Sequence, residues 1–82
     1  MMTNDEKEMF YAQCSEILGI EHDWNDPVLR KTRWNTRRIG NGRFPGFGLI
    51  RCYNEKNIVV ISKAGTKLFT SCEATTDYLR QQ

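Results

Sequence analysis

The apolar residues near the start of the chain recur at the spacing of an α-helix. Four of them would lie on one face of such a helix: Phe10, Cys14, Ile17 and Leu18. Thr3 and Glu6 have the spacing of a capping box, in which each residue satisfies a backbone N–H of the other. Gly19 suits the position just after a helix end, where the backbone is often left-handed. The pattern predicts a helix over residues 4–18.

The second half of the chain alternates between apolar runs and short turns. Three runs have the composition and length of β-strands: Phe47–Tyr53, Ile58–Ile61 and Thr66–Thr70. Turn-forming residues separate these runs at Asn54–Asn57 and at Lys63–Gly65. The pattern predicts a three-stranded antiparallel β-meander over residues 46–70.

A second capping-box pattern, from Thr70 to Glu73, predicts a closing helix over residues 71–80. Three of its side chains are expected to pack on the sheet: Ala74, Tyr78 and Leu79. Because 82 residues leave no room for a second core, residues 1–82 are predicted to form one domain. Its class is α+β, with the meander packed against an N-terminal and a C-terminal helix.

Residues 20–45, between the first helix and the first strand, have neither helical nor alternating periodicity. Gly40-Asn41-Gly42 and Pro45-Gly46 favour turns. The sequence therefore predicts a long basic loop that is rich in glycine, arginine and aromatic residues. Loops of this length in small domains are more often functional than idle.

The formal net charge of +2 conceals an uneven distribution of charge. Residues 27–54 carry seven positive side chains and no carboxylate, whereas the first 26 residues carry seven carboxylates and Lys7. Crowded like charges repel, so the basic stretch needs an external anion or an internal acidic partner. Four carboxylates just upstream could provide the internal partner: Glu16, Glu21, Asp23 and Asp26.

Seven residues of this region have side chains suited to a phosphate-bearing ligand: Arg33, Trp34, Arg37, Arg38, Arg43, Phe44 and Arg51. A guanidinium binds phosphate through a planar pair of donors. Trp34 and Phe44 offer flat surfaces on which bases stack, and the interspersed glycines let backbone N–H groups approach an anion. The pattern indicates a small non-enzymatic protein that binds a nucleic acid or a nucleotide.

Other interpretations of the same residues stay open. Arginine and aromatic side chains also suit an acidic protein surface, as in a protein–protein inhibitor or adaptor of the phage accessory or anti-defence type. In a homo-oligomer, arginines of neighbouring subunits would surround one nucleotide. If the upstream carboxylates neutralise the arginines, the basic surface is only structural.

More specific phosphate-binding motifs do not occur. A dinucleotide fingerprint that starts at Gly40 or Gly46 fails at its sixth position, which is Pro45 or Arg51. The Gly-Lys-Ser/Thr ending of a P-loop does not occur. The run Phe47–Tyr53 does not match the RNA-binding consensus of an RRM. The ligand is therefore predicted only as a chemical class.

Three widely spaced cysteines, Cys14, Cys52 and Cys72, favour a reducing, cytoplasmic location over a disulfide scaffold. With His22 they have the ligand count of a zinc site but not its paired spacing, so we expect buried, inert thiols and no cofactor. His22 is expected to be a solvated loop residue, and no catalytic site is predicted. No apolar run approaches the ~18 residues of a membrane span.

Overall fold

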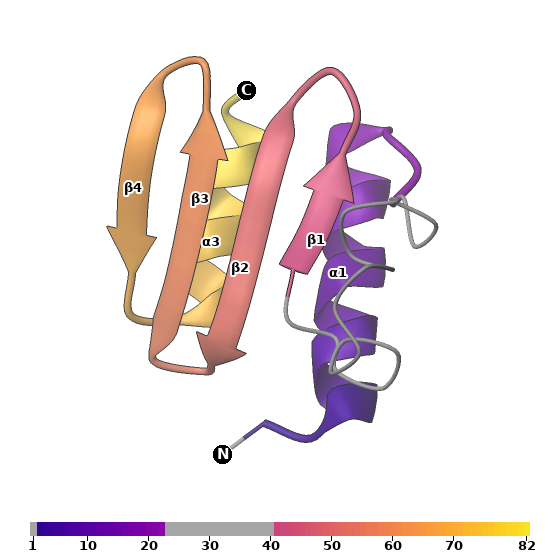
Figure 1. Cartoon of the computed structure of the whole chain (residues 1–82), viewed down its shortest axis with the longest axis vertical. Helices are drawn as coiled ribbons and strands as arrows, with labels where there is room; N and C mark the ends of the chain where they lie inside the picture. Colours follow the sequence, from indigo (N-terminus) through magenta and orange to yellow (C-terminus); the bar gives the residue numbers. More distant parts are fainter. Residues whose placement is uncertain (1, 23–40) are drawn as a thin grey trace, which may run out of the picture.

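The computed structural model describes residues 2–22 and 41–82. These segments form two helices and four strands: α1 (Asn4–Leu18), β1 (Asn41–Phe44), β2 (Gly48–Asn54), β3 (Asn57–Ser62), β4 (Gly65–Phe69) and α3 (Cys72–Arg80). The strands make one antiparallel sheet in the order β1-β2-β3-β4, and both helices lie against the same side of it (Figure 1). The predicted α+β class is confirmed.

The sheet has four strands, so the prediction of a three-stranded meander is wrong. The additional strand, β1, lies at the end of the predicted loop 20–45, and residues 23–40 of that loop lie outside the described residues. All four residues of β1 pair with β2. Its sequence, Asn-Gly-Arg-Phe, has a single apolar side chain and no alternating pattern. This segment is therefore a strand because it pairs with β2.

Gly42 allows β1 to pack closely against α1. A Cβ atom at this position would lie 2.9 Å from Cδ1 of Tyr11 and 2.9 Å from Cε2 of Phe44. Both aromatic rings therefore occupy the space that a side chain would need. A glycine that the sequence suggested as a turn former instead permits close packing within a strand.

The helix α1 begins and ends as predicted. Thr3 Oγ1 accepts the Glu6 N–H at 3.1 Å, and Glu6 Oε1 accepts the Thr3 N–H at 3.0 Å, which completes the capping box. The hydrogen bond from the Thr3 backbone is the main reason that the pKa of Glu6 is lowered. At the other end, Gly19 is left-handed with φ of 67°, and its N–H donates to the Ser15 carbonyl.

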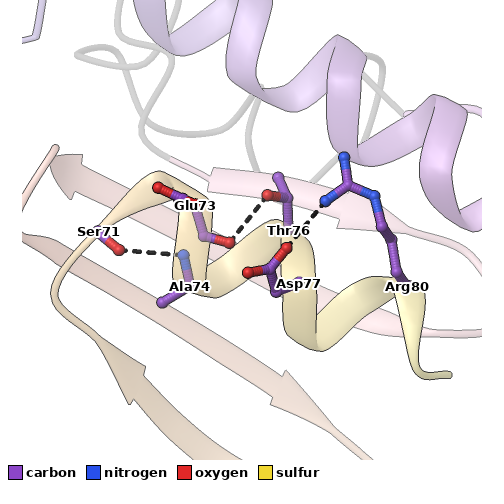
Figure 2. A network of polar contacts seen from close by, with 6 residues as sticks. All are labelled: Ser71, Glu73, Ala74, Thr76, Asp77 and Arg80. Atoms are coloured by element: carbon purple, nitrogen blue, oxygen red, sulfur yellow. Dashed lines mark hydrogen bonds and ion pairs between the residues drawn. The ribbon is translucent and has the colours of Figure 1, made fainter.

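The N-cap of α3 is Ser71 and not Thr70, which the capping-box pattern indicated. Ser71 Oγ accepts the Ala74 N–H at 3.0 Å (Figure 2). Ala74 is exposed, so the expectation that it packs on the sheet is wrong. Leu79 is buried as expected, and the Tyr78 ring lies 5.3 Å from the Phe69 ring of β4.

Two threonines, Thr75 and Thr76, take buried positions on α3 that the sequence analysis did not expect to be packed. The Thr75 hydroxyl donates to the Ser71 carbonyl at 2.9 Å. The Thr76 hydroxyl donates to the Glu73 carbonyl at 3.0 Å, as Figure 2 shows. Because each hydroxyl finds an acceptor within the helix or its cap, burial leaves no unsatisfied donor. This local bonding explains why polar residues are tolerated here.

The core lies between the sheet and the helices, and nine of the described apolar residues are buried in it: Phe10, Tyr11, Cys14, Phe44, Ile50, Cys52, Ile58, Val60 and Leu79. The backbone N–H of Cys52 donates to the Tyr11 hydroxyl at 2.9 Å. Cys52 directly follows Arg51, the last residue of β2 in register with β1. Tyr11 therefore satisfies a strand donor just past the end of β1.

Candidate functional site

The structure separates the predicted site residues into three groups. Arg43 on β1 is exposed and Arg51 on β2 is half-buried, whereas Phe44 is fully buried. The other four residues lie outside the described residues: Arg33, Trp34, Arg37 and Arg38. In the described part of the chain, the predicted set therefore contributes two arginines to the surface.

Phe44 belongs to an aromatic cluster in the core. Its ring stacks on His22, with centroids 5.2 Å apart and planes inclined by 17°, and His22 lies 5.1 Å from the Tyr11 ring. His22 is 7% exposed, so the expectation of a solvated histidine is wrong. Because packing holds the Phe44 ring inside the molecule, we leave it out of the proposed binding surface.

The sheet has a second side, away from α1 and α3, that we call the outer face. Strand alternation and register arrange its side chains in two rows across the strands. The first row contains Arg43, Leu49, Ile61 and Thr66, and the second contains Arg51, Val59 and Leu68. Tyr53 follows Arg51 by two residues along β2 and is exposed, within a register shift between β2 and β3 at Cys52 and Asn54. Among the described residues, no helix or strand covers the outer face (Figure 1).

Apolar side chains dominate the part of the outer face on β3 and β4. Leu68 is 75% exposed, and Tyr53 is 51% exposed. Val59 and Ile61 are half-buried by their neighbours on the sheet. Leu68 and Tyr53 thus expose large apolar groups at two positions of an otherwise regular sheet, which is typical of an interaction surface when such groups are continuous.

The two arginines of the outer face are diagonal neighbours. Arg43 pairs with Leu49, and Arg51 follows Leu49 by two residues, a relation that separates side chains by about 7–8 Å. The Nε atom of Arg51 is buried and makes no hydrogen bond with any residue in the described ranges. Arg51 alternates along β2 with Ile50 and Cys52, which face the core beside α1, so Arg51 and the carboxylates of that helix lie on opposite sides of the sheet.

The charges of the described residues separate between the two layers. The helical layer, residues 2–22 and 72–82, holds seven carboxylates and two cations, so its net charge is −5 with His22 neutral. The sheet and its turns, residues 41–71, hold five cations and one carboxylate, Glu55, so their net charge is +4. Among the described residues, the helical layer is therefore net negative and the sheet layer net positive, although Lys67 of β4 reaches the helical side, where its Nζ lies 5.6 Å from the centre of the Tyr78 ring.

The three cysteines are free thiols, two buried and one half-buried. Burial raises the pKa of Cys14 to about 12 and that of Cys52 to about 11, and it also raises the pKa of Cys72. Thiols that stay protonated near neutral pH are weak nucleophiles. The described residues include all three cysteines and His22, and they contain no group of three or more His, Cys, Asp or Glu that could hold a metal ion.

A hollow of about 250 Å³ lies beside α1. Its walls include Glu8, Ala12, Ser15, Glu21 and His22. Two carboxylates at the walls of one hollow repel an anion, so a phosphate group is not expected to bind there. For a phosphate-bearing ligand, the described residues instead favour the outer face of the sheet.

Comparison of the chain with protein-family models, with curated proteins and with solved structures found no match. Within residues 2–22 and 41–82, no helix combines the length and the apolar character needed to cross a membrane. The functional argument therefore depends on the chemistry of the surface itself.

Sequence reasoning did not select Tyr53 or Leu68 as site residues. The alternation along β2 carries a signal, because Arg51 and Tyr53 share one face while Ile50 and Cys52 share the other. The β3 sequence, Ile-Val-Val-Ile, is apolar on both faces and does not say which side is covered. Only the position of the two helices identifies the open side.

Proposed function

We propose that this protein is a small non-enzymatic binding protein for a phosphate-bearing ligand, a nucleic acid or a nucleotide. The observation that carries the proposal is the position of Arg43 and Arg51 as diagonal neighbours on one face of the sheet. Guanidinium groups bind phosphate through charge-assisted, two-pronged hydrogen bonds. The buried Nε of Arg51 adds a donor that gains a partner if an anion reaches it.

The separation of charge between the layers supports the same proposal. A polyanion is repelled by the helical layer and attracted by the sheet layer, so the protein would meet it with the outer face first. Four further residues of the basic stretch have side chains suited to the same ligand and lie outside the described residues: Arg33, Trp34, Arg37 and Arg38.

Replacing one arginine on each layer tests this proposal. Arg51→Gln and Arg80→Gln each remove one positive charge, the first from the outer face and the second from the exposed side of α3. We expect Arg51→Gln to weaken binding of a fluorescently labelled nucleic acid by about fivefold or more, because a hydrogen bond to a charged group contributes at least ~1 kcal/mol. Fluorescence anisotropy at constant ionic strength measures the affinities.

Arg80→Gln is the matched control, and its affinity should stay close to that of the unaltered protein. Its ion pair with Asp77, at 3.1 Å, is exposed and contributes little to stability. Equal losses in the two variants would mean that net charge alone governs binding. No binding of nucleic acid or nucleotide by the unaltered protein would refute the proposed function.

A second candidate function is that of an inhibitor or adaptor that binds an acidic protein. The 75% exposure of Leu68 favours it, because an apolar anchor beside arginines is a common arrangement in protein interfaces. For this function, Leu68→Glu should abolish capture of a protein partner, and nuclease treatment should leave that capture unchanged. Loss of all capture after nuclease treatment would favour the nucleic-acid proposal.

A further inference from the structure

We infer that the ligand is a single-stranded nucleic acid that lies across the outer face, an inference that rests on the proposed function and assigns the ligand class and the contact surface. Its phosphates lie near Arg43 and Arg51. Its bases lie against Tyr53 and the apolar side chains of β3 and β4. Tyr53 and Leu68 are then binding residues, although no sequence motif indicated them.

The outer face has the same chemical polarity as a nucleotide. Its cations lie on β1 and β2, whereas β3 and β4 present Val59 and Leu68 in the row that begins at Arg51. With strands about 4.8 Å apart, this row extends about 10 Å from its basic end to its apolar end. A nucleotide has a charged phosphate at one end and a flat, largely apolar base at the other. A bound nucleotide would therefore place its phosphate at the Arg51 end of the row and its base at the Leu68 end.

A single strand fits this surface better than a duplex does. In a duplex the bases are paired and stacked inside, so the protein meets mainly phosphates and groove edges. A single strand exposes base faces that stack on aromatic side chains, as they do on the aromatic residues of the four-stranded sheet in one common class of RNA-binding domain. The exposed Tyr53 ring and the apolar side chains beside it have a function only in the second case.

The charges of the face favour a nucleic acid over an acidic protein. A protein surface that satisfies two arginines presents two carboxylates at fixed positions, whereas a nucleic-acid backbone presents a phosphate at every step. The separation of charge between the layers also suits a long polyanion, which the helical layer repels. An acidic protein is then an outcome that the test must be able to reveal.

The experiment measures the affinity of the full chain for three labelled probes. They are a mixed-sequence single strand of about 12 nucleotides, the duplex of the same length, and inorganic polyphosphate. We expect the single strand to bind most tightly. Tyr53→Ala should weaken its binding by about 5- to 150-fold, the range that loss of one stacked base produces. The same change should leave polyphosphate binding unaltered.

Three variants complete the design. Tyr53→Phe keeps a stacking ring and should retain the affinity for the single strand. Leu68→Glu places a carboxylate on the outer face and should weaken binding. Met9→Ala, which removes a 72% exposed side chain from α1, should have no effect. Because Tyr53, Leu68 and Met9 are exposed, these variants should remain folded, and circular dichroism checks this.

The outcomes distinguish the inference from the proposed function. If all three probes bind equally and Tyr53→Ala changes nothing, the protein binds phosphate but the stacking surface is refuted. If duplex binds more tightly than single strand, the ligand class is wrong. If no probe binds, both the single-strand inference and the proposed function are refuted. Capture of an acidic protein through the outer face would then establish the inhibitor or adaptor function.

Discussion

At the scale of single residues, Tyr11 connects the helical layer to the sheet. Its hydroxyl accepts the Cys52 N–H, and its ring packs beside His22 and over Gly42. Burial raises the pKa of Tyr11, and the neighbouring Cys14 thiol has its pKa raised in the same way. The folded protein therefore depends on these groups remaining protonated.

Stability is expected to fall in alkaline solution. Below the ordinary thiol pKa of about 8.5, Cys14 is protonated in both the folded and the unfolded chain, so its contribution is fully present. As the pH rises towards about 12, the unfolded chain releases the proton while folded Cys14 retains it, which favours unfolding. The slope for Cys14 approaches about 1.4 kcal/mol per pH unit.

Urea unfolding in a reducing buffer, repeated from about pH 7 to pH 10, measures this dependence. In Cys14→Ala the free energy of unfolding should fall less steeply with pH, although the variant is less stable at neutral pH because a buried side chain is truncated. A free energy of unfolding that stays constant up to about pH 10 would contradict the expected role of the buried thiol.

At the scale of elements, the helix ends differ in how far local sequence determines them. The capping box at Thr3 forms as its spacing predicts. Near α3, Thr70 and Ser71 are both capable N-caps, and the sequence pattern favours Thr70 because Glu73 follows three residues later. In the structure Ser71 is the cap, with extended backbone angles, and it follows the bend that leads out of β4.

Two single substitutions distinguish these caps. Ser71→Ala should lower the free energy of unfolding by about 1 kcal/mol, because the Ala74 N–H loses its acceptor. Thr70→Ala is the matched control and should be nearly neutral, since Thr70 is exposed and does not cap the helix. Chemical denaturation of both variants measures the difference. A larger loss in Thr70→Ala would mean that Thr70 is the N-cap in solution.

At the scale of the whole molecule, function is expected to follow from the arrangement of charge. Both helices cover one side of the sheet, so that, among the described residues, seven carboxylates lie in the helical layer and five cations lie in the sheet and its turns. Such separation directs a charged ligand to one side of a small protein. The outer face, with Arg43, Arg51, Tyr53 and Leu68, is the surface that this arrangement presents to a polyanion.

Affinity for a single strand is expected to decrease with salt. Each phosphate neutralised on a single strand contributes about −0.7 to the slope of log affinity against log salt concentration. Arg51→Gln should make this slope shallower by about 0.7 if Arg51 contacts one phosphate, and Arg80→Gln should leave it unchanged. Anisotropy titrations at several salt concentrations measure the slopes. An affinity that is independent of salt would exclude phosphate contacts.

The sequence by itself determined most elements of this protein, since their signals are local. The helix over residues 4–18 coincides with α1, and the predicted strands in residues 46–70 correspond to β2, β3 and β4. Helical spacing, caps and turn residues act over a few positions, and so they can be recognised along the chain.

Tertiary structure decided what no local signal contains. β1 exists because Asn41–Phe44 pairs with β2, and Phe44 is a core residue because its ring stacks on His22, which in turn packs against Tyr11. Which side of β3 faces outward depends on where two distant helices dock, since its residues are apolar on both faces. Burial and exposure of a sheet are non-local properties, so the candidate binding surface became definable only once the layers were assembled.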